Sequence, residues 1–388
     1  MESFRPSPER FESMARHRRH LHRQPEVGLE LPDTHAYLES ALTGLGLRVE
    51  VHPASGLTAR IKGSNPETCP IIFRADMDAL PVDEDVDSDF RSTRQGAMHA
   101  CGHDLHMATL LGVVEDLLAT APTRDVIVAF QPGEESDRGA LATLQHKNLD
   151  LEKAEVFAIH VNAVMPTGAI GYTPGTFMAY GDWFRLHFGG QGGHASAPER
   201  TGSPIRAGAS FVEGLVNLAL SLSRDDARVV ATTTEFLSGN TVNVIPTEGS
   251  LRGTLRTVSA DQRAALHRGI RELVDQSAAR HRVQGDLEII EGYPAVICDE
   301  GFIEKFLRIV REIGLADSLQ LMEHPSMVIE DFSYFLHKWP GAMVYVGAAV
   351  GENPTFNHSA TAQFDEAAMA TSFALFTALA RQPGAGGN

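Results

Sequence analysis

The sequence predicts an α/β protein in which a mostly parallel, doubly wound sheet is interrupted by an inserted α+β domain. Three observations predict this fold. Short apolar runs alternate with helical stretches near both ends of the chain, as buried parallel strands between helices do. The middle of the chain instead alternates apolar and polar residues, which is typical of half-exposed strands. Finally, 388 residues exceed what one compact core usually holds.

The first part of the chain contains the expected elements of the large sheet. A helical region covers residues 10–47, with Pro25 and Pro32 as interruptions, and a second helix covers residues 107–119. Four apolar runs are expected as buried strands, at residues 57–61, 71–73, 126–130 and 156–159.

A different pattern begins after Gly175 and ends near residue 293. Its expected order is strand, helix, strand, strand, helix, strand, which is that of a split βαβ, ferredoxin-like unit. These elements are expected at residues 183–188, 204–223, 232–237, 250–258, 261–279 and 287–290.

The last part returns to the first pattern, with helix, strand and helix at residues 300–313, 342–346 and 365–380. We therefore expect a discontinuous large domain of residues 1–180 and 294–388. A small domain of residues 181–293 is inserted into it.

Acidic residues outnumber basic ones, with 50 Asp and Glu against 33 Lys and Arg, so the net charge is −17 at pH 7. A field of that sign repels nucleic acid, and we expect no nucleic-acid partner. The one basic cluster, residues 16–23, is interpreted as a solvated face of the first helix rather than an anion-binding patch.

The sequence gives no sign of a membrane or secretory protein. No apolar run approaches the roughly 20 residues that cross a bilayer, and the N-terminal residues lack the apolar segment of a signal peptide. The three cysteines, Cys69, Cys101 and Cys298, are too few for a disulfide framework. We expect a cytoplasmic protein with no membrane partner.

The densest group of histidines lies in residues 99–106, where Cys101 and His103 flank Gly102. A tight turn at the glycine could direct both side chains at one ion, and a thiolate with an imidazole suits Zn²⁺ and other borderline transition metals. The alternative is a polar loop that caps the helix beginning near Leu105.

Acidic side chains follow two of the expected strands. Asp76 and Asp78 come after one strand, and Glu134 and Glu135 come after another. Adjacent carboxylates at a strand end are costly unless cations compensate them, as a metal pair with a general base would. The alternative is a solvated loop. Asp76 is interpreted as a turn residue and Asp78 as a group that orients an imidazole.

Two further histidines complete the pattern. His160 ends a strand and His358 lies in a loop before the final helix, although either one alone is more often structural. Active sites of open α/β sheets lie at the carboxyl ends of strands. The four sets of candidate ligands are therefore expected to converge on one edge of the sheet.

In this order the motifs resemble those of the dinuclear metal-dependent aminoacylase and carboxypeptidase superfamily. The most similar branch comprises hippurate hydrolases, N-acyl-amino acid amidohydrolases and plant auxin-conjugate (IAA–amino acid) hydrolases. The resemblance covers nearly the whole chain, through motifs at residues 18–26, 74–81, 98–106, 130–135, 192–196, 240–246, 330–332 and 358–365.

The resemblance implies two divalent metal ions per chain, zinc or manganese, with cobalt or nickel as alternatives. The implied metal ligands are Cys101, His103, Glu135, His160 and His358.

The resemblance also implies the catalytic and substrate-binding residues. Glu134 would be the general base and acid, with Asp78 as a further catalytic residue. His194, on the small domain, would contact the substrate carbonyl, commonly across a dimer, and Asn243 and Arg256 would hold the amide or carboxylate end. The large domain would then be the catalytic domain. The small domain would be a lid and dimerisation domain in a homodimer or higher homo-oligomer.

The expected reaction is hydrolysis of an N-acyl amino acid to a free amino acid and a carboxylic acid by a metal-activated water. A dipeptidase or carbamoylase is the first alternative, because the same water attack serves other amides. A cysteine hydrolase with Cys101 as nucleophile is a second alternative. A third is a non-catalytic metal-binding protein, against which the intact Glu134–Glu135 pair argues.

The sequence departs from the family pattern at three places, and the last two, in substrate-facing loops, bear on the substrate more than on the reaction. Gly133 stands where the family usually has Ala, in the turn that holds the carboxylates. Glu199 follows Pro198 where the family often has a second His. Residues 359–363 replace the usual loop after His358.

Overall fold

The fold is described from a computed structural model that covers residues 4–52, 54, 56–65, 67–135 and 138–382. The chain divides into two compact units. The large unit comprises Met1–Gly175, Ile297–Met322 and Asp331–Asn388, and the small unit comprises Thr176–Val296 and Glu323–Glu330.

The large unit is built on an eight-stranded sheet with the strand order β1-β2-β4-β3-β5-β16-β6-β15. Its central strands β4, β3, β5 and β16 are mutually parallel. Strand β2 pairs antiparallel with β1 and β4, and β6 pairs antiparallel with β16 but parallel with β15. The strands are β1 (Val49–His52), β2 (Gly56–Ile61), β3 (Ile71–Asp76), β4 (Val126–Gln131), β5 (Glu155–Asn162), β6 (Ile170–Tyr172), β15 (Leu319–Leu321) and β16 (Gly341–Gly347).

Burial explains why the central strands could be predicted from the sequence. Every residue of β3, β4 and β16 is buried, so these strands read as continuous apolar runs. The predicted fold class, a mostly parallel doubly wound sheet with a separate antiparallel domain, is confirmed.

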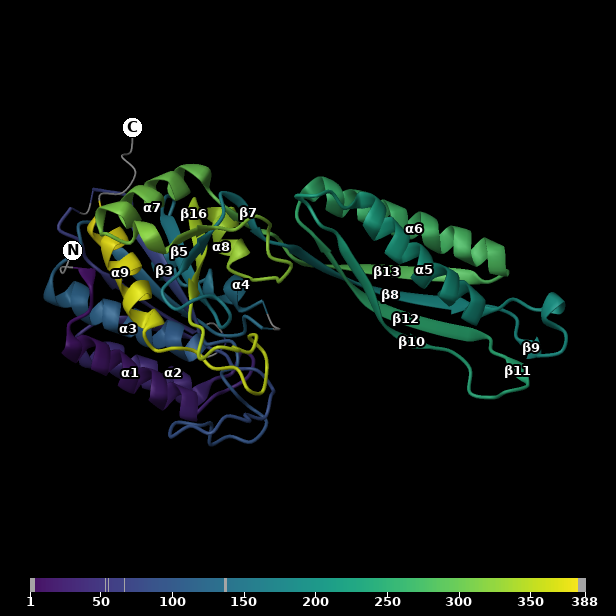
Figure 1. The fold of residues 1–388 in the computed structure, drawn as a ribbon, viewed down its shortest axis with the longest axis horizontal. Helices are drawn as coiled ribbons and strands as arrows, with labels where there is room; N and C mark the ends of the chain where they lie inside the picture. Colours follow the sequence, from purple (N-terminus) through teal and green to yellow (C-terminus); the bar gives the residue numbers. More distant parts are fainter. Residues whose placement is uncertain (1–3, 53, 55, 66, 136–137, 383–388) are drawn as a thin grey trace. The chain divides into compact units, whose positions relative to one another are not determined.

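Helices cover the large sheet, and α1, α3 and α9 pack against one another (Figure 1). The predicted helical region of residues 10–47 is two helices, because Pro32 begins the second at a position where its missing N–H costs nothing. The helices are α1 (Pro8–Arg23), α2 (Pro32–Gly44), α3 (His103–Ala119), α4 (Gly139–Thr143), α7 (Glu300–Glu312), α8 (Ser333–Lys338) and α9 (Ala368–Arg381).

The small unit has a four-stranded antiparallel sheet with the order β10-β12-β8-β13, and α5 and α6 lie together on one face of it (Figure 1). Two further two-stranded sheets join β11 with β9 and β14 with β7. The elements are β7 (Gly175–Met178), β8 (Tyr180–Gly189), β9 (Gly193–His194), α5 (Pro204–Leu222), β10 (Val230–Leu237), β11 (Val244–Ile245), β12 (Glu248–Thr257), α6 (Ala260–His281), β13 (Gln284–Tyr293) and β14 (Val296–Cys298).

The core of the small unit lies between this sheet and its two helices. Phe184, Leu186 and Phe188 of β8 alternate toward the helices and pack with Phe211 and Leu215 of α5. Among the described helices, α5 alone has a length and apolar composition that could cross a membrane. In this fold its inner face is part of the core.

Candidate metal centre

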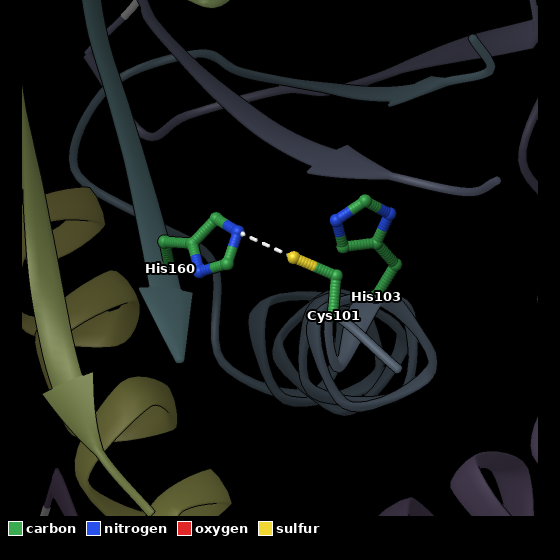
Figure 2. Close-up of side chains that lie close together, drawn as sticks. All are labelled: Cys101, His103 and His160. Carbon is green, nitrogen blue, oxygen red and sulfur yellow. Dashed lines mark hydrogen bonds between the residues drawn. The ribbon is translucent and has the colours of Figure 1, made fainter. Parts of the chain in front are cut away.

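All five predicted metal ligands belong to the large unit and lie at the carboxyl edge of its sheet. Glu135 follows β4, and His160 lies near the end of β5. Cys101 and His103 stand at the beginning of α3, and His358 lies in the loop before α9. Figure 2 shows Cys101, His103 and His160 turned toward a common space between the helix and the strand.

Gly102 makes the close approach of α3 to β5 possible. It is the N-cap of α3 with a left-handed φ of 83°, and a Cβ atom there would lie 2.3 Å from Val161 Cγ2. The turn therefore places Cys101 and His103 on either side of a residue that has no side chain, as the sequence predicted.

The candidate ligand atoms form two overlapping groups that share Cys101. Cys101 Sγ lies 3.4 Å from His160 Nε2 and 3.2 Å from His358 Nε2. His358 Nε2 is 3.4 Å from Glu135 Oε1, and His103 Nε2 is 3.8 Å from the same oxygen. Cys101, His103 and His160 form one group, and Cys101, Glu135 and His358 form another, each with its ligand atoms within 4.8 Å of one another.

Backbone carbonyls set the tautomers of two of these histidines. His103 Nδ1 donates to the Asp78 carbonyl at 2.7 Å, and His160 Nδ1 donates to the Val161 carbonyl at 2.8 Å. Each ring therefore presents an unprotonated Nε2. Burial lowers the pKa of His103 well below its usual range and that of His160 to about 3, so both imidazoles are neutral, the form that binds metals.

The site fits divalent cations. His103 Nε2 is buried and makes no hydrogen bond within the described part of the chain. Its nearest acidic oxygens, on Asp76 and Glu135, are 3.7 and 3.8 Å away. These separations are too long for hydrogen bonds but close to the roughly 3.5 Å between ligand atoms that share one tetrahedral ion.

The environment of Cys101 suits a ligand better than a nucleophile. Burial, and then the charges of Glu135 and Glu134, raise the pKa of the Cys101 thiol well above its usual value. Catalytic cysteines require the opposite shift, which arises beside cations or helix N-termini without competing carboxylates. A bound cation would stabilise the thiolate directly.

Asp78 holds the turn that carries the two glutamates. Its Oδ1 accepts the Glu134 N–H and its Oδ2 accepts the Glu135 N–H, both at 3.0 Å. Burial raises the pKa of Asp78 to about 7. The sequence predicted that the Asp78 side chain orients an imidazole. In the structure the carbonyl of Asp78 orients His103, and the carboxylate orients the glutamate turn. Gly133, with a φ of 67°, enters that turn in a conformation that a glycine adopts without strain.

Asp76 belongs to a buried network that the sequence did not reveal as one unit. Its Oδ2 accepts from Arg74 Nη1 at 2.6 Å, so it is more than a turn residue. Arg74 also donates to Gln131 Oε1 at 2.9 Å and to Asp331 Oδ1 at 3.0 Å. These charged and polar groups come from segments far apart in the sequence, and only their position at strand ends could have linked them.

The loop that presents His358 is held in a strained conformation. His358 has a φ of 71°, in the left-handed region that side chains rarely adopt. Its N–H donates to the Ala100 carbonyl at 2.8 Å, and the neighbouring Asn357 Nδ2 donates to the Val161 carbonyl at 3.0 Å. Strain of this kind persists where the surrounding contacts fix it, and it is concentrated at functional sites.

The small unit brings together only part of the predicted substrate-binding set. His194 of β9 lies beside Asn243, whose carbonyl accepts the Ala195 N–H at 3.0 Å, next to the start of β12 at Glu248. Arg256 lies at the other end of β12, eight positions along the strand, or about 27 Å away. His194 and Asn243 are thus neighbours, whereas Arg256 is not near them in the same unit.

Comparison with known proteins agrees with this geometry. A model of the peptidase family M20/M25/M40 matches residues 72–382. The chain is 33% identical to an N-acetyldiaminopimelate deacetylase of Streptococcus sanguinis over 91% of its length and 93% of the relative's. It is 32% identical to an N-acetyldiaminopimelate deacetylase of Lactiplantibacillus plantarum over 88% of its length and 89% of the relative's.

Two solved structures are similar over nearly the whole chain. One is a putative aminohydrolase from methicillin-resistant Staphylococcus aureus, with a TM-score of 0.88 and 30% identity over 96% of both chains. The other is a dinuclear metal-binding peptidase of the M20 family from Bacillus subtilis, with a TM-score of 0.80 and 27% identity over 96% of this chain and 98% of that one.

The family match, the similar proteins and the groups of candidate ligand atoms support two conclusions. The protein carries out metal-dependent hydrolysis of amide bonds, and it has a site for two divalent metals. The chain belongs to the peptidase family M20/M25/M40 and is a metallo-amidohydrolase.

Proposed function

We propose that this protein hydrolyses the amide bond of an N-acyl amino acid, with Cys101, His103, Glu135, His160 and His358 as ligands of two divalent metals. The observation that carries this proposal is the pair of ligand groups that share Cys101, with a buried glutamate adjoining Glu135. Two cations bound there would polarise the scissile carbonyl and lower the pKa of a water molecule.

Glu134 is the proposed general base and acid. It is buried, and its carboxylate forms one group with the His103 imidazole and the Glu135 carboxylate. The Glu134 carboxylate takes a proton from the attacking water and delivers it to the nitrogen of the leaving amine. Asp78 fixes the backbone that carries Glu134, and its contribution to catalysis is through this position.

His194 is the proposed hydrogen-bond donor to the oxyanion. The Ser196 N–H donates to His194 Nδ1 at 3.2 Å, which leaves the proton on Nε2. The ring is exposed, so this Nε2–H is available to a substrate carbonyl. One well-placed donor of this kind contributes about 3–4 kcal/mol to transition-state stabilisation.

Arg256 is the proposed partner of the substrate carboxylate, and Asn243 the proposed partner of its amide end. Arg256 is half-buried with Nη1 held by the Leu255 carbonyl at 3.0 Å, which orients the guanidinium as a fork. Because His194 lies near the start of β12 and Arg256 at its other end, one small substrate cannot contact both in one copy. A second copy supplying His194 and Asn243 resolves this.

A surface for that second copy exists on the small unit. The edge strand β10 and the neighbouring helix α5 expose apolar side chains, which we call the α5–β10 face: Ile205, Val216, Leu220, Phe236 and Leu237, exposed by 44, 49, 67, 37 and 61%. An open strand edge beside an apolar patch is typical of an interface. We propose a homodimer formed through this face.

The metal and the compartment are proposed on chemical grounds. A thiolate with three imidazoles and a carboxylate favours zinc, while manganese, cobalt and nickel accept the same nitrogen and oxygen ligands. All three cysteines are free thiols, which agrees with a reducing cytoplasm.

A substrate panel tests the proposed reaction. Zinc- and manganese-loaded protein should release free amino acid from N-acetyl or N-benzoyl amino acids, N-acetyldiaminopimelate included, and Glu134→Gln should reduce turnover at least about 1,000-fold with metal still bound. Preferential cleavage of free dipeptides or N-carbamoyl amino acids would favour the dipeptidase or carbamoylase alternative. Near-normal activity of Glu134→Gln would contradict the role of Glu134.

A further inference from the structure

His106 lies among the proposed ligands without being one of them. Its ring centroid is 5.5 Å from that of His103 and 4.9 Å from that of His160. A nitrogen of His106 also falls within 4.8 Å of ligand atoms of Asp76 and His103. By position alone, this buried histidine would be counted as a fourth imidazole of the metal centre.

Both nitrogens of His106 are already engaged. The Val161 N–H donates to His106 Nε2 at 2.9 Å, so that nitrogen carries no proton and its lone pair is used. The proton is therefore on Nδ1, which donates to Asp76 Oδ1 at 2.5 Å. Arg74 holds the other oxygen of Asp76 at 2.6 Å. Neither ring nitrogen of His106 has a lone pair left for a cation.

Val161, whose N–H donates to His106, is also the residue whose carbonyl orients His160. The Val161 carbonyl accepts from His160 Nδ1 at 2.8 Å and from Asn357 Nδ2 at 3.0 Å. The Val161 side chain also fills the space beside Gly102, where a Cβ atom would come within 2.3 Å. A shift of the Val161 backbone would therefore move His160 Nε2 relative to Cys101.

We propose that His106 is a positioning residue, which links the Asp76 carboxylate to the backbone of Val161 and so directs His160 Nε2 at the metal. This inference rests on the proposed role of His160 as a ligand. Replacing a residue that orients a metal ligand through hydrogen bonds typically changes metal affinity by about 10- to 100-fold.

Two amide substitutions separate the two hydrogen bonds of His106. His106→Asn retains a donor near the Nδ1 position, facing Asp76, but leaves the Val161 N–H without its acceptor. His106→Gln places an amide oxygen near the Nε2 position and retains an acceptor for Val161. If the Val161 contact matters most, Gln should preserve metal binding better than Asn.

Calorimetric titration of Zn²⁺ into metal-free protein measures this difference. We expect two binding events in the unchanged protein, one of them weakened about 10- to 100-fold in His106→Asn and much less in His106→Gln, with thermal melting as the check on folding. Loss of one event in both variants, as in His160→Ala, would make His106 a ligand. Unchanged affinities in both variants would remove its positioning role. Absence of zinc binding by the unchanged protein would instead contradict the proposed function.

A second measurement observes His106 directly in the unsubstituted protein. Nitrogen-15 NMR of histidine-labelled protein should show His106 as the Nδ1–H tautomer both before and after Zn²⁺ is added, whereas the Nε2 signal of His160 should shift on binding. The His106→Asn spectrum assigns the signal. A zinc-induced shift of His106 Nε2 as large as that of His160 would overturn the proposal.

Discussion

At the scale of single residues, the metal centre depends on main-chain groups as much as on side chains. Two of its imidazoles give their Nδ1 protons to carbonyl oxygens, and the turn carrying Glu134 and Glu135 is fixed by its own N–H groups on Asp78. Because Val161 lies in β5 and Asp78 stands two residues after β3, the packed sheet fixes both partners, and the ligand atoms are positioned before a cation arrives. Such preorganisation lowers the cost of binding.

Gly102 provides a sharp test of this arrangement. In Gly102→Ala the new Cβ would meet Val161 Cγ2 at 2.3 Å in addition to the left-handed strain. Gly96, with a φ of 73° and nothing within 4 Å, gives a matched control that carries the strain alone. We expect Gly96→Ala to lose about 1 kcal/mol in urea unfolding and Gly102→Ala to lose about 2–4 kcal/mol and bind metal more weakly. Equal losses would show that the contact with Val161 is unimportant.

His22 gives the large unit a pH-dependent stability. Its Nδ1 lies 2.9 Å from Asp104 Oδ2 and its Nε2 lies 3.3 Å from Glu84 Oε1. Burial opposes the charge, but the two carboxylates outweigh it and raise the pKa of His22 to about 9. A raised histidine pKa stabilises the fold fully below the unfolded value of about 6.5, and this contribution is lost as the pH rises through 9.

We therefore expect the free energy of unfolding to fall by up to about 3 kcal/mol between pH 6.5 and 9.5, measured by urea titration. In His22→Gln this slope should flatten. His20→Gln is the control, because His20 stacks on Tyr37 and its lowered pKa confines its titration to lower pH. An unchanged slope in His22→Gln would show that another group titrates in this range.

The sequence pointed to the residues proposed as ligands but not to the groups that orient them. Cys101 and His103 are recognisable because thiolate and imidazole chemistry is carried by residue type. A carbonyl such as that of Val161 is present at every position and leaves no trace in the sequence. The double use of His106 was likewise invisible, since it depends on a strand 55 residues further along the chain.

At the scale of elements, one buried carboxylate connects three of them. Asp331 accepts from Arg74 of β3 at 3.0 Å, from Gln131 of β4 at 2.7 Å and from the Ala140 N–H of α4 at 2.9 Å. We expect Asp331→Asn to cost about 3–5 kcal/mol in urea unfolding, since it leaves the Arg74 charge buried without full compensation. Asp317→Asn, at an exposed position, should change stability by less than about 0.5 kcal/mol. A loss of similar size in both variants would contradict the role of Asp331.

Elements were predictable where burial was uniform or strictly alternating. The runs that became β3, β4, β5 and β16 were all expected, with ends extended by one to three residues. Edge strands such as β1 and β15 were missed, because they are short and partly exposed. Helix α3 begins at His103 rather than at residue 107, since its first turn buries polar side chains against the metal centre and so lacks the apolar pattern.

At the scale of the whole molecule, the account requires two copies for one complete active site. The requirement comes from the separation of His194, in the β9–β11 pair near the start of β12, from Arg256 at the other end of β12, which no local pattern in the sequence could reveal. The α5–β10 face supplies the apolar surface that such an assembly needs.

Complementation between two inactive variants tests this assembly. Glu134→Gln lacks the base and His194→Ala lacks the proposed donor, so each should be inactive by itself. If the donor comes from the partner, unfolding and refolding the two together yields about half mixed dimers, each with one intact site, and about a quarter of normal activity. A mixture that stays inactive, although size measurements show mixed dimers, would place His194 in the site of its own chain.

The central claim, a two-metal hydrolase centred on Cys101, is tested most directly by elemental analysis paired with activity. The account predicts close to two divalent ions per chain, loss of N-acyl amino acid hydrolysis on chelation, and its recovery when zinc or manganese is returned. Cys101→Ala should lower the metal content as well as the activity. Full hydrolysis by metal-free protein would contradict the account and would make the Cys101 thiol the first candidate for the nucleophile.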